Sequence, residues 1–398
     1  MKPPPAPDLS IVIVTRDRRE ALRRTLDHVA RLPDLSQFML DVWVVDNGSR
    51  DGAADLAQAH ALAPSVVRLP ENQGVAARNH AIKRAGGRHI ALLDDDSWPD
   101  PGSLCHAVER LDAEPDLAAV TGPVRLTAGG LESCGLPTVP ILCGVVLRAS
   151  ALREAGGIHP GFVRQAEEYP LALRLYDAGL RIARDPRVTF VHDKPSAPLT
   201  AERLELDLRH NLAWMRAMLP PAFAEPYVQD TRLRYRLLAE HTAPSDAAGL
   251  HPLDLASEQA ARGLTPVGRR AVEALLENRR IASTVADWAH RLRIRRPALL
   301  GYGKNLYAFT SACRREGLDP PAVFDDRPAF VGSTYRGLPV RAVAHLPESG
   351  CDAVVISETA PARIGHVQHL AETLAPGLPC FQPSDAHDRT RAHRSAAA

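Results

Sequence analysis

The sequence predicts an α/β protein, in which buried strands alternate with helices along the chain. Short apolar runs without polar alternation, such as 9–14, are typical of strands that are buried on both faces of a sheet. Segments with apolar residues at helical spacing follow them, beginning with Leu22, Leu26 and Val29. Clusters of turn residues such as 46–52 separate the two kinds of segment. This alternation favours a parallel, doubly wound sheet in the first part of the chain.

Four such strands are expected in the first 100 residues, at 9–14, 42–45, 66–69 and 89–93. The carboxyl ends of parallel strands share one edge of a sheet, and ligands of α/β proteins bind at that edge. The polar residues expected to converge there are Thr15, Asp17, Asp46, Asn72, Asp94, Asp95 and Asp96. No G-x-G-x-x-G motif follows the first strand and the chain has no P-loop lysine motif, so a standard dinucleotide or ATP fold is not expected here.

The acidic triplet Asp94–Asp96 directly follows a buried strand, and Pro99 then ends the run. Adjacent carboxylates repel one another unless a cation neutralises them, and hard oxygen ligands suit Mg²⁺ or Mn²⁺. A solvated acidic turn is the alternative for an isolated triplet. The other polar strand ends favour a metal site that holds a diphosphate.

Composition limits the classes of function. The 398 residues allow two or three domains, and 45% hydrophobic with 24% charged residues is ordinary for a globular protein. A net charge of +1 gives no general field that would attract nucleic acid. Six cysteines without a C-x-x-C pair argue against a zinc site or a disulfide framework and fit a reducing compartment. The opening Pro3-Pro4-Pro5 does not resemble a signal peptide, and the apolar runs are short for a membrane span, so we expect a cytoplasmic protein.

Four ordered motifs resemble the nucleotide-sugar half of family 2 glycosyltransferases, which have the GT-A fold. They are I-V-I-V-T-R-D-R, V-V-D-N-G-S-R-D-G, N-Q-G-V-A-A-R-N and A-L-L-D-D-D-S-W-P, and the resemblance covers roughly the first 220 residues. The sequence is similar to the branch that contains rhamnosyl- and galactosyltransferases of cell-surface polysaccharides. Two positions depart from the pattern, because Asp17 stands where asparagine is usual and His80 where glycine is common.

The resemblance implies roles for individual residues. The first loop and Asp46 would hold the nucleotide base, Arg78 would contact the donor, and Asp94 with Asp96 would bind the metal on the diphosphate. The donor-binding residues expected on this basis and from the strand ends are Thr15, Arg16, Asp17, Asp46, Asn72, Arg78 and Asp95.

A second pair of carboxylates, Glu167 and Glu168, is predicted at the start of a helix that ends at Gly179. Acidic residues are favoured there by the helix dipole, so the pair has a purely structural interpretation as well. The resemblance places the general base in such a pair, followed by an aspartate two positions on, where this chain has Pro170. We assign Glu168 as the base, with Glu167 as the alternative.

His192 follows a short predicted strand, 188–191. A histidine in that position is often structural. In many GT-A enzymes a histidine at this place completes the metal or phosphate site, so the resemblance makes His192 a candidate metal ligand beside Asp94 and Asp96.

The sequence pattern changes after about residue 220. We therefore predict a GT-A domain at 1–222 and a helical linker region at 223–296. Within that region, 244–254 has the composition of a linker. Nine arginines against three acidic residues give the segment 260–296 a local charge of +6. That charge suits an anionic membrane surface or a lipid-phosphate acceptor, and equally a solvated helix face or a contact between domains.

A small Rossmann-like α/β domain is predicted at 297–384, with a disordered tail at 385–398. Its first strand ends in the turn Gly301-Tyr302-Gly303, and Asp325 ends the second strand at about the Rossmann distance. The third glycine of the fingerprint is absent. The domain resembles those attached to sugar-modifying acyltransferases, so Gly301, Gly303 and Asp325 form a candidate second nucleotide site. A scaffold or dimerisation unit is the alternative.

These features together predict a metal-dependent, inverting glycosyltransferase of cell-surface polysaccharide or glycoconjugate synthesis. It would use Mn²⁺ or Mg²⁺, a nucleoside-diphosphate sugar as donor and a sugar or lipid-linked acceptor. It would act in the cytoplasm or at the inner face of the membrane. A peripheral membrane contact and a homodimer are both compatible with the sequence. A catalytically silent nucleotide-sugar-binding protein, a nucleotidyltransferase and an oxidoreductase based on the C-terminal domain are the rivals.

Overall fold

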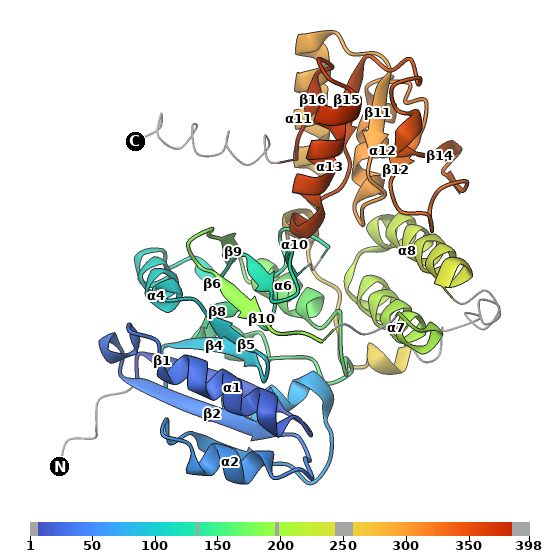
Figure 1. The fold of residues 1–398 in the computed structure, drawn as a ribbon. Coiled ribbons are helices and arrows are strands. Elements are labelled where there is room, and N and C mark those ends of the chain that lie inside the picture. Colours follow the sequence, from blue (N-terminus) through green and yellow to red (C-terminus); the bar gives the residue numbers. More distant parts are fainter. Residues whose placement is uncertain (1–6, 133–134, 196–198, 243–257, 384–398) are drawn as a thin grey trace. The chain divides into compact units, whose positions relative to one another are not determined.

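The computed structural model describes residues 7–132, 135–195, 199–242 and 258–383, which form two compact units (Figure 1). The first unit comprises 7–132, 138–195 and 258–271, and the second comprises 135–137, 199–242 and 272–383. Both contain helices and a largely parallel sheet, so the predicted α/β class is confirmed. The domain boundaries predicted after 222, 296 and 384 stay predictions, and the units divide the chain at other places. The linker 244–254 and the tail 385–398 lie outside the described residues.

The first unit is built on a seven-stranded sheet in the order β3-β2-β1-β4-β8-β6-β9. The four strands that were expected from the apolar runs are present and parallel to one another. The strands of the sheet are β1 (Leu9–Thr15), β2 (Leu40–Asp46), β3 (Ser65–Arg68), β4 (His89–Asp94), β6 (Leu117–Thr121), β8 (Val145–Arg148) and β9 (Arg181–Arg184).

The parallel arrangement that was expected for the first four strands does not extend to β8, which is antiparallel to both of its neighbours, β4 and β6. A buried apolar run has no feature that reveals strand direction. Between β6 and β8 the described chain contains the short strand β7 (Val124–Leu126) and no crossover helix. A parallel neighbour needs such a crossover, so the chain returns in the opposite direction.

A second, three-stranded sheet in the first unit was not predicted. It has the order β5-β10-β7, with β5 (Ser97–Pro99) antiparallel and β7 parallel to β10 (Phe190–His192). Pro99 was expected to end the run that begins with the strand before the acidic triplet. It instead lies in β5, opposite Phe190. This pairing is important for the site because it places His192 opposite Ser97, next to the acidic triplet.

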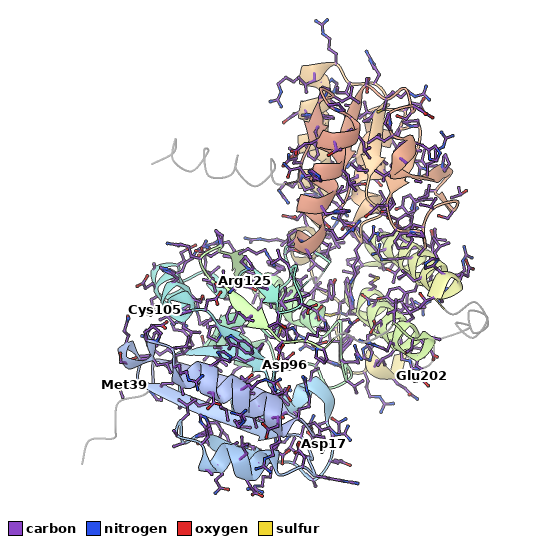
Figure 2. The ribbon with its side chains drawn as sticks, in the orientation of Figure 1. Asp17, Met39, Asp96, Cys105, Arg125 and Glu202 are labelled. Carbon is purple, nitrogen blue, oxygen red and sulfur yellow. The ribbon has the colours of Figure 1, made fainter. Side chains whose placement is uncertain are left out.

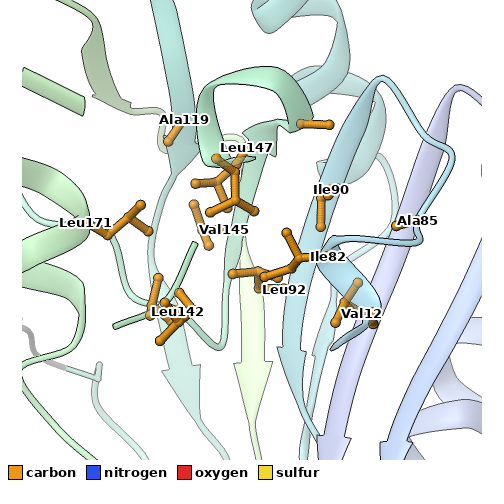
Figure 3. Packing of buried hydrophobic residues seen from close by; sticks show 14 of the residues in the cluster. Val12, Ile82, Ala85, Ile90, Leu92, Ala119, Leu142, Val145, Leu147 and Leu171 are labelled. Carbon is orange, nitrogen blue, oxygen red and sulfur yellow. The ribbon is translucent and has the colours of Figure 1, made fainter. Parts of the chain in front are cut away.

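Alternation along the central strands buries side chains on both faces of the first sheet. Ile90 and Leu92 of β4 belong to one core cluster. Ala91 and Leu93, which alternate with them along the strand, are equally buried but do not belong to that cluster. Figure 3 shows Ile90, Leu92 and Leu147 packed with side chains from the covering helices. The helices of this unit are α1 (Arg19–Ala30), η1 (Leu35–Gln37), α2 (Ala53–Ala59), η2 (Gly74–Arg78), α3 (Asn79–Ile82), α4 (Ser103–Ala113), α5 (Ala149–Glu154) and α6 (Glu168–Asp177).

The second unit contains a six-stranded sheet in the order β13-β14-β12-β11-β15-β16. Leu299 and Val355 pack in one cluster with residues of α11 and α12, and Leu300 and Ile356 pack in another with residues of α13. Helices therefore cover both faces, as the Rossmann-like prediction requires. The strands are β11 (Pro297–Leu300), β12 (Val323–Asp325), β13 (Thr334–Tyr335), β14 (Leu338–Ala342), β15 (Ala353–Ile356) and β16 (Cys380–Phe381).

The arginine-rich segment folds mainly into two helices, α10 and α11. No helix in the described ranges combines the length and the apolar character that a membrane crossing needs. The remaining helices are α7 (Ala201–Met218), α8 (Pro221–Thr242), α10 (Arg269–Leu276), α11 (Asn278–Leu292), α12 (Leu306–Arg315), η4 (Val343–His345) and α13 (Pro361–Leu374).

The core of the first unit gives a stability prediction. Leu147 of β8 is fully buried between Ile90 and Ala119, its partners on the two adjacent strands. We expect Leu147→Ala to lower the free energy of unfolding by about 2–5 kcal/mol, because it removes buried methyl groups and leaves a cavity. The control Met39→Ala, at a side chain 43% exposed, should change it by less than about 0.5 kcal/mol. Urea unfolding followed by circular dichroism measures both, and equal effects would contradict the packing.

Candidate active site

The registers of the parallel strands bring the predicted donor residues to one edge of the first sheet. Thr15 at the end of β1 is paired with Asp46 at the end of β2, and Val14 is paired with Asp94 at the end of β4. The three polar strand ends therefore form a row across β2, β1 and β4. This is the edge of the sheet at which the sequence analysis expected the ligand to bind.

Two loops that follow β1 and β2 are joined by hydrogen bonds of their backbone and side chains. The Asp17 amide donates to Ser49 Oγ (3.1 Å), and Asp17 Oδ1 accepts the Arg50 amide (2.7 Å). Asp46 is buried, and its Oδ1 accepts the Ser49 amide at 2.9 Å. Arg16 is exposed and lies 3.8 Å from the Asp17 carboxylate. The loops thus have a defined shape, with Asp17 near their outer end (Figure 2).

Asn72 reaches this edge through a residue that the sequence analysis did not select, Asn47. The Asn47 side chain donates to Asn72 Oδ1 (2.8 Å) and accepts the Gln73 amide (2.8 Å). Its backbone amide donates to the Thr15 carbonyl oxygen at 2.9 Å. Asn47 therefore fixes the loop after β3 to the ends of β1 and β2. The turn sequence Asp46-Asn47-Gly48 was the available signal.

Each carboxylate of the acidic triplet is bound by a different set of groups. Arg78, which is buried at the end of η2, forms an ion pair with Asp94. Asp95 accepts a hydrogen bond from Thr15 Oγ1 (2.8 Å), and Arg18 lies 2.9 Å from Asp95 Oδ1 and 2.6 Å from Asp96 Oδ2. Arg18 was not predicted as a site residue, although it lies in the T-R-D-R motif. The positive charges of Arg18 and Arg78 offset the repulsion between the neighbouring carboxylates.

The pKa values of the two buried aspartates, Asp95 and Asp96, are shifted in opposite directions. Burial raises the pKa of Asp95 to about 7, against the effect of the Arg18 charge and the Thr15 hydroxyl. Burial also disfavours ionised Asp96, but hydrogen bonds from His192 and Arg18 outweigh it and lower its pKa. Asp96 lies well inside the first unit (Figure 2) and is the ionised centre of the cluster.

His192 is buried at the end of β10 and contacts acidic groups through both ring nitrogens. Nε2 lies 3.1 Å from Asp96 Oδ1 and 3.9 Å from Asp94 Oδ2, and Nδ1 lies 3.1 Å from Glu132 Oε2. Burial alone would lower the His192 pKa, but the bonds to Asp96, Cys143 and Glu132 raise the pKa to about 12. The imidazole is therefore cationic in this structure.

The donor atoms of Asp94, Cys143 and His192 all lie within 4.8 Å of one another. Carboxylate, thiol and imidazole are ligands that fit a divalent transition metal. The predicted ligands Asp94 and His192 are thus brought together, whereas Asp96 is bound by Arg18 and His192. Cys143 and Glu132 were missed because they lie in a stretch of chain without a recognisable motif.

Glu167 and Glu168 lie where the chain enters α6, after two residues with positive φ, Gln165 (56°) and Ala166 (66°). Backbone of this kind is uncommon outside glycine and is often found at functional sites. Glu168 begins the helix and is half-buried, and Pro170 is tolerated because it lies in the first turn.

Glu167 is the more buried of the pair, at 9% exposure, and its Oε2 has no hydrogen-bond partner among the described residues. Burial and the neighbouring Glu168 charge raise the pKa of Glu167 to about 8, whereas the Arg78 charge acts in the opposite direction. Glu167 is therefore close enough to the Arg78–Asp94 pair to interact with its charges.

The candidate second site lies in the second unit and is occupied by internal contacts. Asp325 accepts hydrogen bonds from the Tyr302 amide (2.6 Å) and from the Arg327 side chain (2.7 Å). A Cβ added at Gly301 would meet Glu358 Cβ at 2.8 Å, and one at Gly303 would meet the Ser357 carbonyl oxygen at 2.6 Å. Both glycines are thus needed for close packing against the end of β15. A nucleotide at this place stays a prediction.

Residues 10–132 match the family model described as Glycosyl transferase family 2. The segment contains β1 to β6 and the acidic triplet. The match agrees with the resemblance on which the GT-A prediction rests.

Two relatives named for polysaccharide synthesis each match about a quarter of the chain. "Putative teichuronic acid biosynthesis glycosyltransferase TuaG" of Bacillus subtilis is 36% identical over 97 residues, which are 23% of this chain and 37% of that protein. Succinoglycan biosynthesis protein ExoU of Rhizobium meliloti is 34% identical over 101 residues, 24% of this chain and 28% of that protein. The match thus spans well under half the length of either relative.

A solved structure of the mannosyltransferase PcManGT from Pyrobaculum calidifontis, in complex with GDP-Man and Mn²⁺, is 20% identical. It covers 79% of this chain and 88% of its own, with a TM-score of 0.46.

The raised pKa of Glu167 predicts a pH-dependent stability. A carboxyl group whose folded-state pKa lies near 8, against its usual 4.5, contributes stability that is complete below pH 4.5 and is lost as the pH rises to about 8. In this window the free energy of unfolding should fall by up to about 1.4 kcal/mol per pH unit more in the wild type than in Glu167→Gln. Urea unfolding between pH 5 and about pH 8 measures the difference.

The matched control is Glu154→Gln, which alters an exposed glutamate of α5 and should leave the wild-type slope unchanged. If Glu167→Gln and the wild type showed parallel pH profiles, the Glu167 carboxylate would be ionised at neutral pH and the burial argument would be wrong.

Proposed function

We propose that the chain is a metal-dependent glycosyltransferase that moves a sugar from a nucleoside diphosphate to an acceptor hydroxyl with inversion at the anomeric carbon. One observation carries the proposal: the loops after β1 and β2 and the acidic triplet meet at one sheet edge, inside a segment that matches the glycosyl transferase family 2 model. The names of TuaG and ExoU suggest a role in the synthesis of surface polysaccharide or glycoconjugate. The acceptor would be a sugar or a lipid-linked sugar, met in the cytoplasm or at the inner face of the membrane.

The donor nucleotide would bind along the loops after β1 and β2. Asp46 uses Oδ1 to accept the Ser49 amide, and its Oδ2 accepts no hydrogen bond from the described residues. A carboxylate oxygen of this kind is suited to accept hydrogen bonds from a base or a ribose. The Asn47 contacts hold the loop with Asn72 against the same edge, so the described backbone is prearranged for a ligand.

The diphosphate would lie over the acidic triplet and its cations. Asp94 and His192, with Cys143 beside them, would hold a divalent metal whose positive charge stabilises the diphosphate leaving group. Arg18 and Arg78 are already directed at the triplet by their ion pairs with Asp95, Asp96 and Asp94. Guanidinium groups bind phosphate oxygens well, so these two side chains would orient the diphosphate.

The acceptor proton would be removed by the carboxylate pair at the start of α6. Glu167 supports this role better than Glu168, because its buried Oε2 lacks a hydrogen-bond partner among the described residues and its pKa is raised to about 8. A buried acceptor without a partner is available to a substrate hydroxyl, and a base works best with a pKa near the operating pH. The original assignment of Glu168 stays as the alternative.

Binding of the donor is the first test. In a thermal-shift screen of UDP-, GDP- and dTDP-sugars with Mn²⁺, one nucleotide family should raise the melting temperature, because a ligand that binds only the folded state stabilises it by RT ln(1 + [L]/Kd). Asp94→Asn should abolish the Mn²⁺-dependent part of the shift. Asp94 suits this purpose because its side chain is 36% exposed, whereas Asp96 is buried and its replacement would disturb the fold.

The matched control is Asp55→Asn, at an exposed carboxylate of α2 that pairs with Arg68. It should retain the full shift. If no nucleotide sugar stabilises the wild type, the transferase proposal is wrong. Pyrophosphate release from a nucleoside triphosphate would instead support a nucleotidyltransferase, and a donor shift without any transfer would support a silent binding protein.

The base assignment is tested by comparing Glu167→Gln with Glu168→Gln. We expect Glu167→Gln to lower kcat by about 10²-fold or more with donor binding largely intact, because the proton acceptor is lost while the donor site is kept. In the wild type kcat/KM should rise with pH up to about pH 8, as Glu167 becomes ionised. A large loss confined to Glu168→Gln would restore the original assignment, and weak donor binding in both variants would contradict a base in this pair.

A further inference from the structure

We propose that Cys143 is a protein ligand of the divalent metal, and that its sulfur makes the site prefer a thiophilic transition metal such as Co²⁺ or Zn²⁺ to Mg²⁺. This inference deepens the proposed function and rests on it. The acidic triplet alone would give an oxygen site for Mg²⁺ or Mn²⁺, so the thiol changes the chemistry that the metal must satisfy.

The position of the sulfur supports the proposal. The sulfur of Cys143 contacts the His192 ring, 3.5 Å from Nδ1. One donor atom from each of Cys143, His192 and Asp94 can be chosen so that all three lie within 4.8 Å of one another. Ligands held at about 2.0–2.3 Å from a tetrahedral metal lie roughly 3.5–4 Å apart, so only small side-chain movements are needed. Cys143 and His192 are each 6% exposed, so bulk water competes little for the metal.

One hydroxyl group fixes the backbone of Cys143 relative to Asp94. Ser97 Oγ accepts a hydrogen bond from the Asp94 amide at 2.8 Å and donates one to the Cys143 carbonyl oxygen at 2.8 Å. Ser97 is fully buried and lies in β5 opposite His192. The three candidate ligands are therefore all positioned through contacts with the same residue or its strand.

The next residue, Gly144, allows the chain to approach the small sheet. A Cβ at this position would meet Val124 Cγ2 at 2.7 Å and the Phe190 ring at 3.0 Å. Val124 belongs to β7 and Phe190 to β10, two residues before His192. The absence of a side chain at Gly144 therefore keeps Cys143 close to the strand that carries His192.

The histidine has the surroundings that metal ligands usually have. Glu132 Oε2 lies 3.1 Å from His192 Nδ1, and Lys194 Nζ lies 3.1 Å from the same oxygen. A carboxylate on one ring nitrogen orients the imidazole and directs the other nitrogen at the metal. Here the other nitrogen, Nε2, faces Asp94 and Asp96.

Coordination by Cys143 is a substitution of metal for a proton. The S–H bond of Cys143 and the N–H bond at Nε2 of the His192 imidazolium break, bonds from the sulfur and from this nitrogen to the metal form, and both protons are released to the buffer, so no oxidant or reductant is involved. Thiolate and imidazole favour Co²⁺ and Zn²⁺, and Mg²⁺ prefers oxygen ligands and water. We therefore expect the order Zn²⁺ and Co²⁺ tighter than Mn²⁺, with Mg²⁺ weakest.

The test is a Co²⁺ titration of the full chain without nucleotide, followed by near-ultraviolet absorption. A thiolate bound to Co²⁺ gives a charge-transfer band, which a site made of oxygen and nitrogen ligands lacks. The wild type should show the band. Cys143→Ser should lose it and bind Co²⁺ at least about ten-fold more weakly, with circular dichroism confirming an unchanged fold.

Cys105→Ser is the matched control. Cys105 belongs to α4 of the same unit, contacts Asp34 and Gln37, and lies well away from Asp96 in Figure 2. This variant should keep both the band and the affinity. A band that survives in Cys143→Ser, or Co²⁺ binding by the wild type without a band, would overturn the inference.

A second measurement needs no substitution at the site. Zn²⁺ should protect Cys143 of the wild type from a thiol-alkylating reagent and leave Cys105 as reactive as before, as read by peptide mass spectrometry. Equal labelling of Cys143 with and without Zn²⁺ would overturn the inference. The donor screen stays independent: a nucleotide-sugar shift without a Co²⁺ band leaves the transferase proposal intact, and the band without any shift leaves only the metal site.

Discussion

The mutual repulsion of three adjacent carboxylates is the constraint on which the site of the first unit depends. Asp94, Asp95 and Asp96 are consecutive, and two of them are almost completely buried. Such a cluster is stable only if nearby groups compensate its charge or hold one member protonated. The protein does both, because Arg78, Arg18 and His192 are each paired with the triplet and burial raises the pKa of Asp95 to about 7.

These compensating groups come from separate parts of the chain, so the fold of the unit is linked to the charge balance. Arg18 precedes α1, Arg78 ends η2 and His192 ends β10. A substitution that removes one cation leaves a buried carboxylate without its partner, which costs more than the pair itself contributes. The acidic triplet therefore organises the loops around it even without a ligand, and the Asn47 contacts extend that order to the loop with Asn72.

Much of this arrangement could be predicted from the sequence, because the strand signals are local. Apolar runs located β1, β2, β3 and β4, and the rule that parallel strands present their carboxyl ends together placed Thr15, Asp46 and Asp94 at one edge. The direction of β8 could not be read, since a strand buried on both faces has the same composition in either direction. The sheet β5-β10-β7 was also missed, although a strand was expected at 188–191, because the sequence does not reveal which short strands pair.

The site residues that were not predicted were missed for a similar reason. Arg18 lies in a recognised motif, but its pairing with Asp96 spans 78 positions, and nothing in the local pattern indicates that partner. Glu132 and Cys143 lie on either side of a segment whose described residues, 135–142, contain no helix or strand. Their contacts with His192 depend on the pairing of β10 with β5 and β7, which the sequence did not reveal. Long-range pairing therefore sets the limit of the sequence analysis.

The same charge balance bears on how a metal could enter this site. A divalent cation added to a triplet that is already compensated would leave an excess of positive charge, and the Arg18 and Arg78 contacts would have to weaken. Ligands that give up protons remove this difficulty, because a thiol that becomes a thiolate and an imidazolium that becomes an imidazole each cancel one unit of the metal's charge. Cys143 and His192 are the two groups of the candidate triad whose side chains can release such protons. On the proposed assignment they would allow metal to bind before the donor, whereas a site of carboxylates alone would need the diphosphate to complete its charge.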